Sequence, residues 1–329
     1  MRRVVFVITL GALVLAGAFV VAASALRPAA REVPAQVVVI PPGAALREIA
    51  ALLDDAGLIR SPLAFVVAAR VRGLGARLQS GEYLLSASMP TLEILDKIAQ
   101  GQVMLHRLTI PEGYTAAQIA DALAEAELAD RDAFLRLVRE EGNSFAFAFL
   151  GGRRNLEGYL FPDTYYFPRA LPVHQIVQTM LARFDQRVTP QLRQQARAQG
   201  VTLHETLTIA SMVEREAKLP VERPIIAGVI YNRLRREWRL EIDATVLYAL
   251  GRRGGSLTAA DLLVESPYNT YRQSGLPPGP ICNPGLAAIE AAARPAATPY
   301  LFYVLRPDGS HAFSTTFDEH QRNIRRWRK

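Results

Sequence analysis

The chain has 329 residues, half of them apolar, which is enough for a membrane segment and one to three small domains. Its net charge of +7 and pI near 9.7 suit a polyanionic partner, but no run of Lys and Arg residues indicates nucleic-acid binding. A single cysteine, Cys282, excludes an intrachain disulfide and a CxxC redox pair, and the five histidines lack metal-ligand spacing. We therefore expect no metal and no cofactor.

An uncharged segment covers residues 4–26 and is long enough to cross a hydrocarbon core of about 30 Å. Because Arg2 and Arg3 precede it, the positive-inside rule places the N-terminus in the cytoplasm and the remaining chain outside. We expect a retained single-pass anchor in the inner membrane, with a periplasmic catalytic region. The alternative is a cleaved signal peptide, since Ala23, Ser24 and Ala25 fit an A-x-A cleavage site.

Two stretches about 70 residues apart match each other. Each begins with an apolar run and a Pro-x-Gly turn, at residues 38–43 and 108–113, and continues with apolar residues at helical spacing. A second expected strand lies at residues 81–84 in the first stretch and at 157–160 in the second. Each unit is therefore predicted as strand, helix, helix, strand, helix. The first unit resembles a LysM-like module that grips glycan; the alternative is a spacer.

The segment after Thr202 predicts a central helix from Leu203 to about Lys218. Thr202 and Glu205 have the T-x-x-E form of a capping box, and the helix is apolar on two sides. Glu216 and Glu214 each fall within an apolar stripe. Burial raises a carboxyl pKa, so either residue suits a general acid that keeps its proton near neutral pH. The alternative is an ordinary salt bridge with a neighbouring Arg or Lys.

From residue 156 to about 320 the sequence resembles the endolytic murein transglycosylases of the YceG/MltG family. The matching blocks, in chain order, are EGYLFPDTY at 157–165, ASMVERE at 210–216, YNRL at 231–234, SPYNTY at 266–271 and GLPPGPI at 275–281. The chain departs from the family pattern at Ala217, Trp238, Glu241 and Ala244, where the family more often has Thr, Met, Gln and Pro.

The resemblance implies lytic cleavage of the bond between N-acetylmuramic acid and N-acetylglucosamine inside nascent glycan strands. One glutamate protonates the bond and the muramoyl 6-hydroxyl closes on the anomeric carbon, which leaves a 1,6-anhydro end and terminates elongation. By position in the motif Glu216 is assigned as the acid, while Glu214 stays open. The resemblance also implies peptidoglycan strands as substrate and membrane-bound peptidoglycan synthases as partners.

A Pro- and Gly-rich loop at residues 266–285 is expected to present polar side chains to a cleft, although a self-bonded structural loop is the alternative. The predicted substrate-binding residues are Asn232, Arg233, Asp243, Thr245, Tyr248, Tyr268, Asn269, Thr270, Tyr271, Gln273 and Asn283. An Ala-rich helix at 286–293, a hairpin from 300 to 314 and a basic helix at 317–326 are expected to follow.

The expected fold class is α+β: an N-terminal transmembrane helix, a LysM-like α/β module and a lysozyme-like mixed α+β catalytic domain. The expected divisions are a cytoplasmic tail at 1–3, the transmembrane helix at 4–26, a tether at 27–35, the module at 36–104, and a catalytic region at 105–329 that comprises a second repeat-like unit at 105–200 and a catalytic core at 201–329. Two other functions stay open: a non-catalytic scaffold that binds peptidoglycan for cell-wall synthases, and an ordinary hydrolase.

Overall fold

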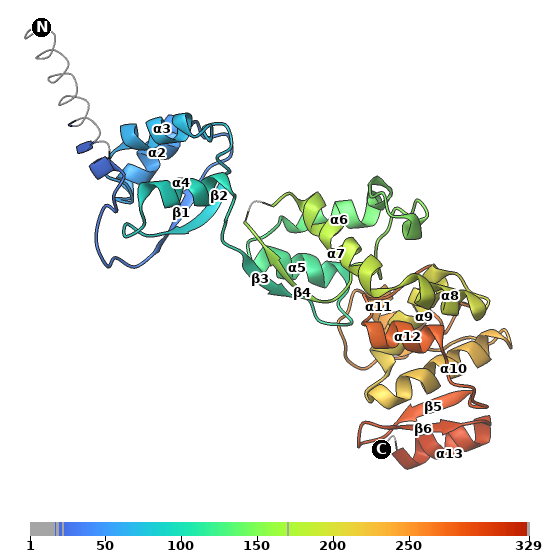
Figure 1. The fold of residues 1–329 in the computed structure, drawn as a ribbon. Coiled ribbons are helices and arrows are strands. Elements are labelled where there is room, and N and C mark those ends of the chain that lie inside the picture. Colours follow the sequence, from blue (N-terminus) through green and yellow to red (C-terminus); the bar gives the residue numbers. More distant parts are fainter. Residues whose placement is uncertain (1–16, 18–19, 22, 170, 328–329) are drawn as a thin grey trace, which may run out of the picture. The chain divides into compact units, whose positions relative to one another are not determined.

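The computed structural model describes residues 17, 20–21, 23–169 and 171–327 (Figure 1). The chain divides into two compact units: unit 1 contains residues up to His106 and a short segment beginning at Tyr166, and unit 2 contains the remainder from Arg107. Within the described ranges, no helix is both long and apolar enough to cross a membrane. Most of the anchor expected at residues 4–26 lies outside those ranges.

Unit 1 is a small α/β module. Strand β1 (Gln36–Ile40) pairs antiparallel with β2 (Gly81–Leu85), with Val38 opposite Tyr83. Helices α2 (Leu46–Asp55), α3 (Pro62–Val71) and α4 (Thr91–Ala99) complete its core. Tyr83 is fully buried, and its hydroxyl donates a hydrogen bond of 2.8 Å to the Gln79 carbonyl, so the polar end of the ring is satisfied inside the core.

The first part of unit 2 repeats this element order. Strand β3 (His106–Thr109) leads to α5 (Ala116–Glu125) and α6 (Arg131–Glu140), followed by two short 3-10 turns (Gly142–Ser144 and Ala148–Leu150). Strand β4 (Thr164–Phe167) pairs with β3, and α7 (Val173–Arg187) follows. The order strand, helix, helix, strand, helix is thus confirmed for both matching stretches.

The expectation of a strand at residues 157–160 is wrong, because this segment is a buried turn. Gly158 has a φ of +90°, which a side chain rarely tolerates, and a Cβ there would lie 2.3 Å from Pro280 Cγ. The backbone N–H groups of Gly158 and Leu160 donate to the Asn283 side chain instead of to a neighbouring strand. The second strand of the repeat forms a few residues later, as β4.

The centre of unit 2 is a helical cluster around α9 (Leu203–Glu216). Helices α8 (Pro190–Ala198), α10 (Arg223–Leu234), α11 (Asp243–Ala249) and α12 (Leu286–Ala293) pack against it. The hairpin β5 (Phe302–Leu305) and β6 (His311–Ser314) packs against α13 (Phe317–Trp327), close to the helix and hairpin expected from the sequence (Figure 1).

The capping box that predicted α9 is present. The Thr202 hydroxyl accepts a hydrogen bond from the Glu205 N–H, and the Glu205 carboxylate accepts one of 2.7 Å from the Thr202 N–H. The helix ends at Glu216 and not at Lys218, because Ala217 already has extended dihedral angles (φ −67°, ψ 119°). Glu216 is therefore the last helical residue, at the point where the chain turns away from the core.

Candidate active site

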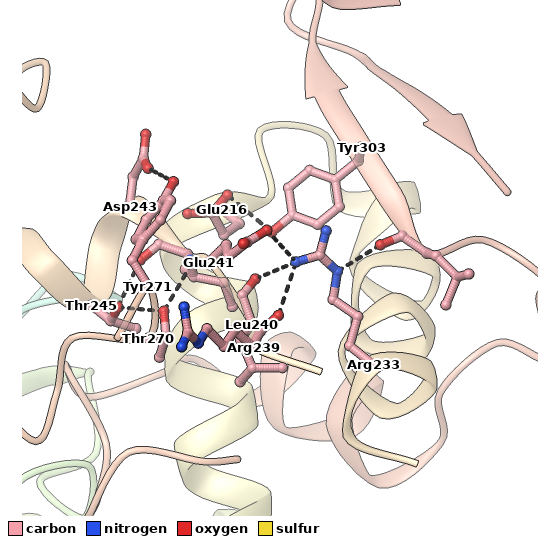
Figure 2. Close-up of polar contacts among 12 residues, drawn as sticks. Glu216, Arg233, Arg239, Leu240, Glu241, Asp243, Thr245, Thr270, Tyr271 and Tyr303 are labelled. Atoms are coloured by element: carbon pink, nitrogen blue, oxygen red, sulfur yellow. Dashed lines mark hydrogen bonds and ion pairs between the residues drawn. The ribbon is translucent and has the colours of Figure 1, made fainter. Parts of the chain in front are cut away.

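A cavity of about 230 Å³ lies at the C-terminal end of α9 and has Glu216 in its wall. Two further acidic side chains, Asp243 and Glu241, face it from the segment that starts α11. Tyr303 of β5 contributes a ring from the hairpin, and Tyr271 comes from the Pro- and Gly-rich loop. Figure 2 shows these side chains pointing toward one another from elements far apart in the sequence.

Burial and, second to it, the negative charge of Asp243 together raise the pKa of Glu216 to about 7. The Tyr303 hydroxyl opposes this rise by donating a hydrogen bond of 3.1 Å to Glu216 Oε2 (Figure 2). A carboxyl group with this pKa is about half protonated at neutral pH. It can therefore donate a proton and, once ionised, take one back.

The rest of the cavity wall is held by hydrogen bonds. The Arg233 guanidinium donates to the carbonyl oxygens of Leu301 (2.7 Å) and Leu240 (2.9 Å) and to Glu241 Oε2 (3.2 Å). The Tyr271 hydroxyl donates a hydrogen bond to Asp243 Oδ1. These contacts fix the hairpin and the start of α11 relative to Glu216.

Glu214 lies in a different environment, although it is only two residues from Glu216. Its Oε2 accepts a hydrogen bond of 3.0 Å from the Gly285 N–H at the start of α12, and Oε1 lies 3.6 Å from the Arg223 guanidinium. Burial raises the pKa of Glu214, while the Gly285 N–H and Arg223 oppose that rise. Glu214 therefore caps a helix and pairs with an arginine inside the fold, and it is not among the residues lining the Glu216 cavity.

Of the predicted substrate-binding residues, the structure brings Arg233, Asp243 and Tyr271 to the Glu216 cavity. Several others point into the protein. The Asn232 amide donates to the Thr298 and Tyr300 carbonyls. The Thr245 and Thr270 hydroxyls lie 2.9 Å apart, and both residues are buried.

The Pro- and Gly-rich loop bonds largely to itself and to its neighbours. The fully buried Asn269 side chain donates to the Leu262 and Val264 carbonyls. Asn283, also fully buried, bonds to the 157–160 turn. Gln273 is exposed and lines a separate surface depression.

A second cavity of unit 2, of about 390 Å³, contains Tyr248 in its wall. The Tyr248 ring packs against Tyr268, with ring centroids 4.9 Å apart, and its hydroxyl donates to Glu157 Oε2 at 3.3 Å. Burial raises the pKa of Glu157 to about 7. Hydrogen bonds from the Ala116 N–H, Tyr248 and Asn283 and the positive charge of Arg139 oppose this rise.

Tyr303 and Glu157 also reach the cavities, although the sequence pattern does not mark them as site residues. Tyr303 lies in a short strand whose pattern gives no sign that one ring reaches across to α9. Glu157 falls in the segment whose pattern predicts a strand. The one feature of the sequence that points to a special role for Glu157 is its position as an acidic residue in an otherwise apolar and aromatic block, residues 156–161.

The fold and the site together define a mixed α+β protein with a half-buried carboxyl group of raised pKa at the end of a central helix. The model of the YceG-like family matches residues 38–326, and the chain belongs to that family.

Two curated relatives, from Streptococcus pneumoniae strain D39 and Bacillus subtilis, carry the name endolytic murein transglycosylase. The first is 33% identical over 315 residues, which cover 87% of this chain and 57% of the relative, so the chain spans little more than half of that protein. The second is 33% identical over 325 residues, 94% of this chain and 90% of the relative. A crystal structure of a YceG-like protein from Listeria monocytogenes has a TM-score of 0.61 and 34% identity, and the match covers 89% of this chain and all of that one.

The raised pKa of Glu216 makes stability depend on pH. Because the folded-state pKa of about 7 exceeds the ordinary value of 4.5, the folded protein favours the protonated form. That contribution is fully present below about pH 4.5 and is lost as the pH rises through 7. Glu216→Gln, which never ionises, should be about 1–3 kcal/mol more stable than wild type at pH 8, with little difference at pH 4.5, by urea unfolding.

The matched control is Glu125→Gln, the same acid-to-amide change at an exposed position of α5. It should show no comparable gain at pH 8. If Glu216→Gln were no more stable than wild type at pH 8, burial of charge at Glu216 would be the wrong explanation for its pKa.

Proposed function

We propose that this protein is an endolytic peptidoglycan lytic transglycosylase, with Glu216 as its catalytic acid and base. The observation that carries the proposal is the Glu216 carboxyl, which lines an open cavity and has a pKa of about 7. The names of the curated relatives support the choice of peptidoglycan as substrate. The engagement of Glu214 with Gly285 and Arg223 supports Glu216 over Glu214.

In this mechanism protonated Glu216 donates its proton to the oxygen that joins N-acetylmuramic acid to N-acetylglucosamine. The bond between that oxygen and the anomeric carbon breaks, and positive charge develops at that carbon. The muramoyl 6-hydroxyl then bonds to the anomeric carbon and gives its proton to the Glu216 carboxylate, which restores the starting acid. Asp243 lines the same cavity, where its negative charge would stabilise the developing positive charge.

The product of purified protein acting on isolated glycan strands tests this proposal. We expect 1,6-anhydro-muramoyl ends by mass spectrometry, since internal closure adds no water. Glu216→Gln should lower the rate about 100- to 10,000-fold, the usual contribution of a general acid. Glu214→Gln keeps an oxygen that can accept the Gly285 N–H and should retain activity within about tenfold of wild type.

Other products would support the alternatives. Reducing muramoyl ends would indicate an ordinary hydrolase in which water replaces the 6-hydroxyl. Glycan binding without any product from wild type would indicate a non-catalytic scaffold. Full activity in Glu216→Gln would refute the assignment of the acid.

Substitutions of two neighbours of Glu216 should shift the pH dependence of the reaction rate in opposite directions. The rate should fall as the pH rises above about 7, because Glu216 loses the proton that it must donate. Tyr303→Phe removes a hydrogen bond that favours the carboxylate, so its profile should move to higher pH. Asp243→Asn removes a neighbouring negative charge, so its profile should move to lower pH. The measurement is kcat/KM against pH for each variant.

Tyr300→Phe provides a control, since Tyr300 lies just before β5 and does not line the Glu216 cavity. Its profile should match that of wild type. Shifts of the same sign in Tyr303→Phe and Asp243→Asn would contradict the electrostatic assignment of these two neighbours.

We also propose that residues 4–26 anchor the protein in the inner membrane, with residues 1–3 in the cytoplasm, a tether at 27–35 and the remaining chain in the periplasm. Residues 36–104 would act as a LysM-like glycan-binding module, and residues 105–329 as the catalytic region, with a second repeat-like unit at 105–200 and a catalytic core at 201–329. This placement would bring the catalytic region close to membrane-bound synthases.

Membrane fractionation of cells tests the anchor. We expect the full-length chain in the membrane fraction, released by detergent and not by high salt, because the proposed segment lies in the hydrocarbon core. External protease added to spheroplasts should digest the region after residue 35. Recovery of a shortened chain in the soluble periplasmic fraction would instead show that the signal-peptide interpretation is right.

A further inference from the structure

The second cavity of unit 2 is larger than the one at Glu216 and is surrounded by arginines. It has a volume of about 390 Å³ and lies among α5, α6, α11 and the loop after α11. Five guanidinium groups line it, those of Arg131, Arg139, Arg215, Arg252 and Arg253. We call it the arginine cavity.

The ion pairs around the arginine cavity leave an excess of positive charge. Asp121 is shared by Arg131 (2.8 Å) and Arg253 (2.6 Å). Arg131 also pairs with Asp132 at 3.1 Å, and Arg252 pairs with Asp261 at 3.0 Å. The Arg215 guanidinium donates to a backbone carbonyl, that of Arg253. Among the described residues, no carboxylate lies within ion-pair distance of Arg139 or Arg215. A guanidinium group matches the two oxygens of a carboxylate, so an anionic ligand is favoured here.

The buried wall of the cavity offsets this charge only in part: the positive charge of Arg139 acts on Glu157 and lowers the pKa of that carboxyl. Glu157 is only 5% exposed and is enclosed by the Ala116 N–H, the Asn283 amide and the Tyr248 hydroxyl. Its raised pKa of about 7 also reduces its negative charge at neutral pH. Thr115 and Gln118 also line the cavity, and although their side-chain oxygens accept hydrogen bonds within the capping box of α5, the Thr115 O–H and the Gln118 NH2 group can donate to a ligand.

The arginine cavity adjoins the Glu216 cavity. Arg215 lines the first and Glu216, the next residue of α9, lines the second. The same alternation recurs at the start of α11, where Ala244 lines the first and Asp243 the second. Consecutive helical residues point about 100° apart, so the two cavities occupy neighbouring faces of the same two helix ends. A ligand that occupies both cavities would pass around these helix ends.

We propose that the arginine cavity binds the carboxylates of the short peptide that hangs from the muramoyl sugar, while the sugar occupies the Glu216 cavity. The inference rests on the proposed function, since peptidoglycan strands carry such peptides, with free carboxylates, on their muramoyl residues. The arginine cavity would then select peptide-bearing strands over strands whose peptides have been removed.

Binding of soluble fragments tests the proposal without turnover. The full chain carrying Glu216→Gln is titrated calorimetrically with a disaccharide that bears a tetrapeptide, and with the same disaccharide lacking the peptide. We expect the peptide-bearing fragment to bind about tenfold more tightly, the scale of one charge-assisted contact. Adding Arg139→Gln and Arg253→Gln should abolish that advantage and leave the affinity for the peptide-free fragment unchanged.

Arg136→Gln is the matched control, because Arg136 is exposed on the same helix, α6, and lines neither cavity. It should retain the full preference. Equal affinity for the two fragments in the parent chain would refute the proposal, and so would an equal loss for both fragments in the double arginine variant. Wild type that makes anhydro product without any preference refutes the peptide site alone. A preference for the peptide without any product would uphold the site and refute the proposed activity.

Discussion

The buried side chain of Asn283 is the contact on which the polar architecture of unit 2 depends. Its Oδ1 accepts hydrogen bonds of 2.9 Å from the Gly158 and Leu160 N–H groups. Its Nδ2 donates to the Tyr114 carbonyl and to Glu157, both at 3.0 Å. One amide thus satisfies a turn, the approach to α5 and a buried carboxyl group. An aliphatic residue of similar size would remove the acceptor of the Gly158 and Leu160 N–H groups inside the protein. Glu157 would keep the Ala116 N–H, and the Tyr114 carbonyl would keep the Asn283 backbone N–H.

The residues on either side of Asn283 extend this connection to α9. The Ile281 N–H donates to the Ser211 hydroxyl, and the Gly285 N–H donates to Glu214. The chain from 281 to 285 therefore joins the repeat-like part of unit 2 to its central helix. Glu214 belongs to this connection, whereas Glu216, half a turn further along, reaches an open cavity. The two glutamates of one short motif therefore differ in role because their surroundings differ: Glu214 bonds to groups inside the fold, and Glu216 lines a cavity.

The sequence predicted the features that local rules control. The capping box at Thr202 and the apolar stripes predicted α9, and the repeated Pro-x-Gly turns predicted the order of elements in both matching stretches. It failed at residues 157–160, where a side chain 123 residues away, Asn283, takes the backbone hydrogen bonds that a strand would need. No pattern within the segment records that distant partner.

The site was predictable in part for the same reason. Glu216 and Asp243 lie at helix ends and could be chosen from motif and position. The inward direction of Asn269 and Thr270 could not, because a loop rich in proline lacks regular backbone pairing and recruits its own polar side chains to satisfy buried groups. The hydrogen bond from Tyr303 depends on a hairpin nearly 90 residues further along the chain, which only the tertiary structure reveals.

The division of the chain into two units limits how gene segments that encode such a protein can recombine. A short segment that starts at Tyr166 belongs to unit 1, although it is encoded within the stretch that forms unit 2. There, Arg169 forms an ion pair of 3.1 Å with Glu82. A single break in the gene could therefore not deliver either unit whole. Recombination between relatives should therefore exchange the two units together.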